Sequence, residues 1–217
     1  PEDWEKTIWM YQEQNKCTPL AAAIKISQSI WQTKTKPDES EIHELSIRSP
    51  NFILSILSIL IIGLLVKRWG FGIGSLGSAL FLAMHPWHIR NGTEASSTGI
   101  IIFLILLGSL WLTYAINDNK DQWKYWILFG ANQLMLAWTI PEGIFYAIGF
   151  TLCGILLILS QNTNFSFRST SISKLVAANA MACMVYLPLF MPNIMQAIRW
   201  EPIENPHSSI MPNFGNT

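Results

Sequence analysis

Side chains able to act on a substrate are concentrated in one short segment, HPWHIRNGTEA, at residues 85–95. It holds two imidazoles, His85 and His88, the guanidinium of Arg90 and the carboxylate of Glu94. A guanidinium can bind a phosphate through two parallel hydrogen bonds, and a carboxylate can take a proton from a hydroxyl or orient it. Arg90 and Glu94 are spaced i,i+4, so on a helix they would share one face. The segment is therefore a candidate site for a phosphorylated substrate and a proton transfer.

The same residues also have a structural explanation. Arg90 and Glu94 can form a local ion pair at a helix end, while Trp87 and the histidines anchor the chain at a membrane interface. Neutral imidazoles spaced i,i+3 can converge on a metal ion, but Pro86 and the lack of a third nearby ligand disfavour such a site. No metal-binding residue is assigned.

Two further charged residues stand beside apolar segments. Glu142 follows Pro141, where a carboxylate can either stabilise a helix N-terminus or contact a substrate. Arg48 precedes Pro50 and can either contact a substrate or extend toward lipid headgroups. We include Glu142 and Arg48, with His85, His88 and Arg90, among the candidate substrate-binding residues.

The elements that hold these residues are predicted to be membrane-spanning helices. Of the 217 residues, 50% are hydrophobic and only 13% are charged, and the mean hydropathy is +0.29. So little charge is atypical of a soluble protein of this length. The 14 basic residues are matched by 14 acidic ones, which disfavours nucleic-acid binding. The three widely spaced cysteines indicate neither a disulfide framework nor a zinc site.

Apolar runs divide the chain after residue 50, and each approaches the about 20 residues that a spanning helix needs. They are 51–66, 72–89, 98–116, 125–141, 143–160 and 175–198, and none contains Asp, Glu, Lys or Arg. Small residues in the second run, Gly72, Gly74 and Gly77 with Ser75 and Ser78, favour close helix packing there. Residues 1–50 predict amphipathic interfacial helices, broken near Pro19, and residues 199–217 begin another loop. The predicted fold is an all-α polytopic membrane protein with about six transmembrane helices.

Basic residues indicate the orientation of these helices. They fall in every second short connection: Lys67 and Arg68, Lys120 and Lys124, Arg168 and Lys174. Such connections are typically cytoplasmic. Residues 1–50, the 85–95 segment, Glu142 and residues 199–217 would then be extracytoplasmic, in a multi-pass protein of the bacterial inner membrane. Because the chain begins at Pro1 without a signal peptide and ends in a polar run, we expect it to be part of a longer protein.

Three motifs resemble, in order and spacing, those of polyprenyl-phosphate-sugar glycosyltransferases of the GT-C superfamily. This group includes the dolichyl-phosphate-mannose protein mannosyltransferases and the aminoarabinose transferase of lipid A. Thr18-Pro19-Leu20 is similar to a Pro-Pro-Leu element of the first outer loop. ELSIRSP at 44–50 followed by KRWG at 67–70 is similar to the "alRlPs … grr-x-G" stretch, and 85–99 to the "hPwhi-x-x-g-x-EaR-x-Y-g" segment. The resemblance covers most of the chain.

The resemblance implies an inverting transfer of a sugar from a polyprenyl-phosphate donor to a lipid, glycan or protein acceptor at the extracytoplasmic face. Glu94 matches the second acidic position of the family. The main catalytic base is expected upstream of Pro1, with Glu2 or Asp3 as the alternative. A divalent metal ion is used by some relatives and not by others.

Two other functions remain open. A transporter or lipid flippase would need polar groups within the membrane, and Asn132, Gln133 and Asn179 lie in apolar runs. A non-catalytic membrane subunit is indicated by Ser96 and Thr98, which stand where the glycosyltransferases often have Arg and Tyr.

Overall fold

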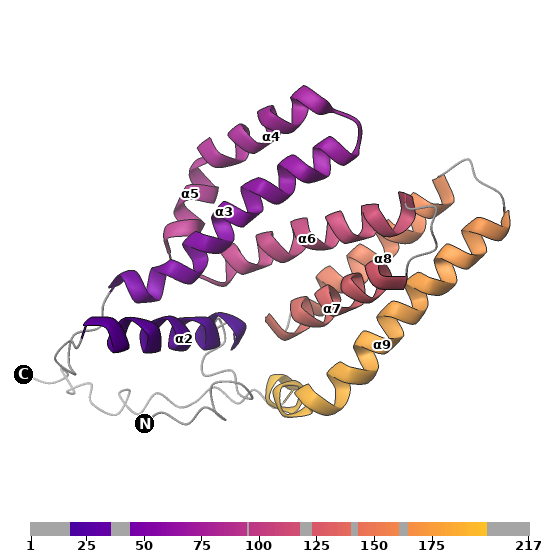
Figure 1. The fold of residues 1–217 in the computed structure, drawn as a ribbon. Coiled ribbons are helices and arrows are strands. Elements are labelled where there is room, and N and C mark those ends of the chain that lie inside the picture. Colours follow the sequence, from indigo (N-terminus) through magenta and orange to yellow (C-terminus); the bar gives the residue numbers. More distant parts are fainter. Residues whose placement is uncertain are drawn as a thin grey trace, which may run out of the picture.

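The computed structural model describes residues 18–35, 44–94, 96–117, 123–139, 143–160 and 165–198. All regular structure in these ranges is helical, which confirms the predicted all-α class. The helices are α2 (Thr18–Thr35), α3 (Glu44–Arg68), α4 (Gly72–Met84), α5 (Pro86–Thr93), α6 (Ser97–Asn117), α7 (Trp123–Thr139), α8 (Gly143–Ser160) and α9 (Phe165–Ile198). Figure 1 shows the long helices running back and forth between two ends of the molecule.

Four helical segments in the described residues are long and apolar enough to cross a membrane: Glu44–Arg68, Ser97–Asn117, Gly143–Ser160 and Phe167–Pro188. They indicate a multi-pass membrane protein, but the expected count of about six spans is not confirmed. The apolar helix α4 has 13 residues and α7 has 17. At 1.5 Å per residue these helices are about 20 and 25 Å long, shorter than a hydrocarbon core of about 30 Å.

The apolar run 72–89, expected to be one span, is divided into two helices. Helix α4 ends at Met84, His85 has extended φ and ψ of −71° and 121°, and α5 begins at Pro86. Proline disfavours helical geometry in the residue before it, and it is well suited to the first position of a new helix. The Pro86 ring therefore explains why the run changes direction at His85.

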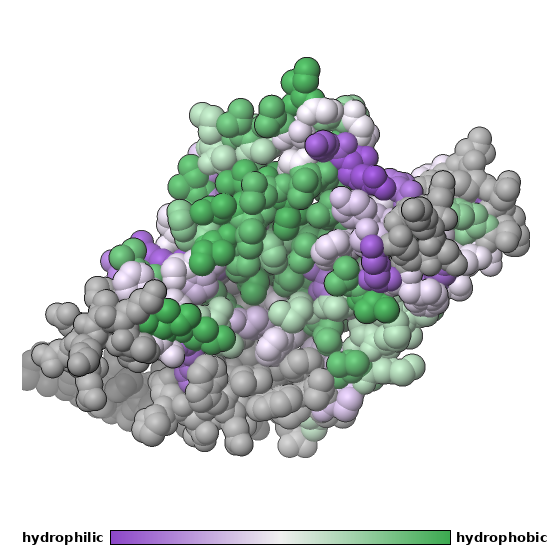
Figure 2. All heavy atoms as spheres, in the orientation of Figure 1, coloured by the Kyte–Doolittle hydropathy of each residue, from purple (hydrophilic) through white to green (hydrophobic). Residues whose placement is uncertain are grey.

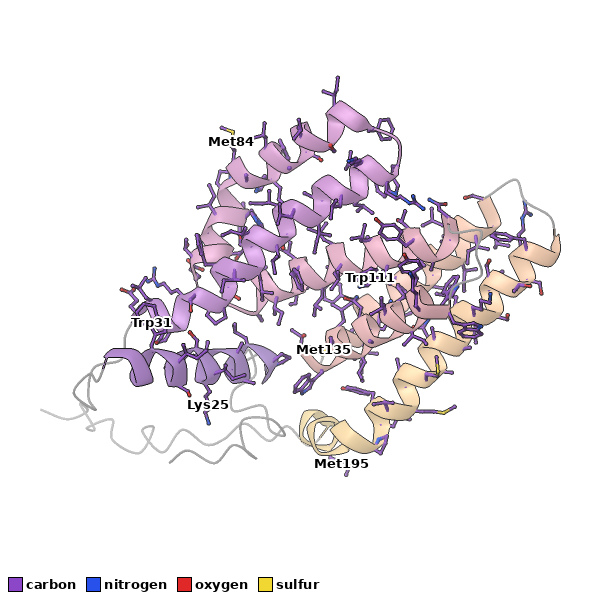
Figure 3. The ribbon with its side chains drawn as sticks, viewed as in Figure 1. Lys25, Trp31, Met84, Trp111, Met135 and Met195 are labelled. Carbon is purple, nitrogen blue, oxygen red and sulfur yellow. The ribbon has the colours of Figure 1, made fainter. Side chains whose placement is uncertain are left out.

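Helix α3 begins before the predicted run 51–66 and continues through Pro50. Proline has no N–H for the carbonyl of Ser46, but the hydroxyl of Ser49 donates to that carbonyl at 3.4 Å. The same hydroxyl lies 2.8 Å from the hydroxyl of Ser27 on α2. Helix α2, which follows the predicted break near Pro19, packs on α3, with Trp31 lying toward the first turns of α3 (Figure 3). The helix predicted before Pro19 falls outside the described residues.

One hydrophobic core cluster lies between α6, α7, α8 and α9, where Phe129, Ile158, Leu175 and Ala178 are fully buried. Many large apolar side chains face outward instead, such as Ile73 and Met84, which are 90% and 75% exposed. Met84 points away from the other helices (Figure 3). Figure 2 shows a hydrophobic surface over α3 and α4, with hydrophilic residues toward both ends. Such a band suits contact with lipid between two aqueous faces.

The closest helix contacts involve other glycines than those predicted. A Cβ atom on Gly130 of α7 would lie 2.7 Å from the Ala178 carbonyl oxygen of α9. A Cβ on Gly108 of α6 would lie 2.5 Å from Asn132 Nδ2 of α7. Gly72 and Gly77 have nothing within 4 Å of such an atom.

Basic and aromatic side chains gather at the end of the molecule where α3 and α6 finish and α7 begins. Arg68 lies 4.9 Å from the ring centre of Tyr114, which stacks on Tyr125 at 5.2 Å. Lys174 lies 5.7 Å from the Trp123 ring. Arg168 and Lys174 belong to α9 rather than to the loop in which the sequence placed them. Basic groups over aromatic rings are typical of a membrane interface.

Candidate functional site

The segment that carries the candidate residues forms α5 and the connection that follows it. Helix α5 has only 8 residues and divides into two faces. His88, Asn91 and Gly92, spaced i, i+3 and i+4, are buried against α3. Arg90 and Glu94 are exposed on the other side. Burial of His88, Asn91 and Gly92 against α3 therefore leaves Arg90 and Glu94 facing outward.

His88 is part of the contact between α5 and α3. Its Nε2 atom lies 2.8 Å from the hydroxyl oxygen of Ser55 and 3.2 Å from the Ser55 carbonyl oxygen. A Cβ atom on Gly92 would lie 2.6 Å from the same hydroxyl oxygen, so glycine allows the helices to approach this closely. Because His88 is only 6% exposed and its ring already has these partners, its position is explained by packing.

Asn51 of α3 fixes the end of α5 and the beginning of α6. It is fully buried, and its amide nitrogen donates to the carbonyl oxygens of Glu94 at 2.5 Å and Ser96 at 2.8 Å. A longer bond of 3.5 Å reaches the Asn91 carbonyl. These carbonyls follow the last turn of a short helix, where backbone acceptors lack helical partners. Asn51 thus holds the backbone from which the Glu94 side chain projects.

Arg90 and Glu94 form the local ion pair that the spacing allows. Arg90 Nε lies 2.9 Å from Glu94 Oε1, and the two side chains are 65% and 49% exposed. The Arg90 guanidinium lies 5.9 Å from the ring centre of Trp87. An exposed pair of this kind is weak, since water screens both charges. An anionic ligand can therefore replace Glu94 at the guanidinium without a large loss of stability.

His85 occupies a different position, between α4 and α5. Its ring is 5.8 Å from that of Phe81, and its carbonyl accepts hydrogen bonds from the amides of His88 and Ile89. It therefore joins the two helices and is not brought to the Arg90–Glu94 pair by any hydrogen bond in the described residues. In these ranges no three His, Cys, Asp or Glu side chains form a group suited to a metal ion. A divalent ion, which the resemblance allows, has no ligand set in this part of the chain.

Arg48 lies near the beginning of α3 in a second exposed ion pair. Its guanidinium contacts Glu44, also at i,i+4, and the side chains are 51% and 73% exposed. The α3 residue Asn51 contacts the end of α5, so both ion pairs belong to the same end of the molecule. Glu142 lies outside the described residues.

Sequence reasoning missed the buried residues that support this site, Asn51 and Ser55. Their signal was present: with Ser58 they form a polar series at i, i+4 and i+7 in an otherwise apolar run, and all three are buried. Such a series predicts that α3 contacts another helix through its polar face.

The arrangement can offer a guanidinium to an anion and a carboxylate to a hydroxyl, both at one end of the helices and both supported by α3. His88 and Asn51 are buried and hold α5 against α3, so they do not belong to the exposed surface. In comparisons with known proteins, the chain matches no family model, no curated protein and no solved structure.

Proposed function

We propose that the chain belongs to a membrane glycosyltransferase. It would move a sugar, with inversion, from a polyprenyl-phosphate donor to a lipid, glycan or protein acceptor at the extracytoplasmic face of a bacterial inner membrane. The proposal draws on the ordered motifs that resemble GT-C enzymes. The observation that carries it is the Arg90–Glu94 pair, exposed on α5 and supported by buried contacts to α3.

The chemistry follows from the two side chains. In this proposal Arg90 exchanges Glu94 for the donor phosphate and stabilises the negative charge that grows on it as the sugar leaves. The released Glu94 carboxylate orients the acceptor group by accepting a hydrogen bond. The main base implied by the resemblance is a different carboxylate, outside the described residues. Arg48, in the second exposed pair, is a further candidate for binding the phosphate.

The test is sugar transfer by membranes that contain the full protein, with a tritium-labelled polyprenyl-phosphate hexose as donor. We expect Glu94→Gln to lower the transfer rate at least about 100-fold, which is the lower end of the loss typical for a positioned acid–base group. Glu44→Gln is the matched control, because it breaks the other exposed i,i+4 pair at the same end. Transfer by Glu94→Gln at the wild-type rate, or an equal loss in Glu44→Gln, would contradict the assignment.

Transport or lipid flipping is a second candidate function, favoured by one observation. Gln133 and Asn179, polar residues within apolar helices, line a cavity between α7, α8 and α9. Ligand movement across the membrane that required these two residues and not Glu94 would support transport over sugar transfer.

A further inference from the structure

A cavity of about 520 Å³ lies between α7, α8 and α9, on other helices than the Arg90–Glu94 pair. Its volume falls within the roughly 300–1,000 Å³ typical of small-molecule sites. Aliphatic side chains form most of its wall, and none of its lining residues is Asp, Glu, Lys, Arg or His. Three wall residues, Ile148, Leu152 and Leu187, are more than half exposed, so the cavity reaches the apolar outer surface.

Most polar groups in the wall are already paired. The Thr151 hydroxyl donates to the Ala147 carbonyl at 2.9 Å and lies 3.2 Å from Asn179 Oδ1. Asn179 Nδ2 donates to the Leu175 carbonyl at 2.8 Å, and the Tyr186 hydroxyl donates to the Ala137 carbonyl at 3.4 Å. These bonds keep the polar side chains against the helices.

Gln133 differs from them. It is only 3% exposed, and neither its amide nitrogen nor its amide oxygen has a hydrogen-bond partner among the described residues. A buried amide left without partners costs about 1–3 kcal/mol, and inside a membrane no bulk water relieves it. Gln133 lines the cavity, but its amide atoms lie beneath the cavity wall, so an occupant reaches this donor and acceptor when the side chain rotates toward it.

We propose that this cavity binds a neutral amphipathic lipid. An uncharged ester, amide or hydroxyl group pairs with the Gln133 amide, and a single hydrocarbon chain lies along Leu152 and Leu187. A charged headgroup would be buried without an opposite charge, which is much more costly than a neutral one. A purely apolar occupant, such as an aliphatic helix face, would leave Gln133 unpaired. The proposal does not depend on glycosyl transfer, because it involves none of the residues of the Arg90–Glu94 site.

The experiment uses the full protein in lipid nanodiscs and a photoreactive monoacylglycerol with a diazirine in its acyl chain. Labelled residues are located by mass spectrometry of peptides. We expect saturable labelling on α8 and α9 at the cavity wall, which unlabelled monoolein displaces. A photoreactive fatty acid with the same chain is the comparison, because its headgroup is anionic. We expect it to give no saturable labelling at the cavity wall.

Two pairs of variants separate binding at the cavity from contact with the bilayer. Gln133→Leu should lower the saturable labelling about tenfold, as expected for the loss of one buried hydrogen-bonding group. Asn132→Leu is its control, because Asn132 is also a buried, unpartnered amide on α7 but does not line the cavity. Leu152→Trp should fill the cavity and abolish labelling, whereas Leu156→Trp, one turn further along the exposed side of α8, should not.

Three results would overturn the proposal. The first is labelling that Gln133→Leu and Leu152→Trp leave unchanged, which would indicate general contact with lipid. The second is equal, saturable labelling by the anionic fatty acid. The third is absence of labelling in a folded protein, as expected if another segment of protein occupies the cavity. None of these results would bear on sugar transfer, which Glu94→Gln tests separately.

Discussion

Replacing Gly130 with leucine is expected to force α7 away from α9 and to destabilise the molecule. The nearest atom to a Cβ at this position is a backbone oxygen, that of Ala178 at 2.7 Å, and a backbone atom cannot rotate aside. Gly130 and Ala178 also lie beside the fully buried Phe129 and Leu175. Overpacking in a core costs about 1–3 kcal/mol, and we expect the upper end or more here.

The measurement is thermal unfolding of the detergent-solubilised protein, followed by the folded fraction in size-exclusion chromatography. We expect Gly130→Leu to lower the midpoint by about 6–12 °C, as a loss of about 3 kcal/mol implies for a chain of this size. Gly77→Leu is the control, since a side chain on Gly77 meets nothing within 4 Å. If Gly77→Leu were the less stable variant, the helix packing described above would be wrong.

The second large effect is expected from Asn51→Leu. Leucine is close to asparagine in size, so the change removes the hydrogen bonds to the carbonyls of Glu94, Ser96 and Asn91 with little change in packing. Each bond contributes about 0.5–1.5 kcal/mol, and the stranded carbonyls add to the loss. We expect a destabilisation of about 2–4 kcal/mol and a looser backbone between α5 and α6.

Hydrogen exchange distinguishes this local effect from general unfolding. Backbone amides in a peptide covering residues 86–97 should exchange faster in Asn51→Leu, while those of α8 should change little. Asn132→Leu is the control, because it removes a buried amide that has no partner in the described residues, and its stability should stay near wild type. Unchanged exchange in that peptide would show that Asn51 does not hold the segment carrying Glu94.

Hydropathy was sufficient to place some helices and insufficient for others. The runs 98–116 and 143–160 coincide closely with α6 (Ser97–Asn117) and α8 (Gly143–Ser160), because polar residues bound them on both sides. The run 72–89 contains no charge, so its hydropathy did not reveal the break at Pro86, which comes from backbone geometry. Because of Arg168 and Lys174 the predicted run began too late, at residue 175, although long basic side chains are tolerated on a helix near a membrane surface and α9 begins at Phe165.

The candidate site could be located from the sequence only as a segment. Spacing correctly indicated that Arg90 and Glu94 would share a face, since that relation is local to one helix. Spacing could not indicate that His88 is buried, because its partner Ser55 lies 33 residues earlier on another helix. The same is true of Asn51, whose acceptors lie 40 to 45 residues away. Long-range contacts of this kind depend on how the helices pack.

The separation of the molecule into two chemically different ends rests on helix packing as well. Arg68 and Lys174 lie with aromatic rings at one end, and the Arg90–Glu94 pair lies at the other, beside the beginning of α3. If the basic end is cytoplasmic, as the distribution of basic residues predicts, the exposed pair lies on the extracytoplasmic side, where the proposed lipid-linked donor would reach it.

The most direct test of this account is the accessibility of single cysteines on the two sides of the membrane. The native cysteines are first replaced by serine, and then Thr93 beside the Arg90–Glu94 pair or Trp69 after α3 is changed to cysteine; both positions are exposed. We predict that a membrane-impermeant maleimide labels Thr93→Cys in intact cells and labels Trp69→Cys only after permeabilisation. Labelling of both from one side, or the reverse pattern, would contradict an extracytoplasmic site on a membrane-spanning helical protein.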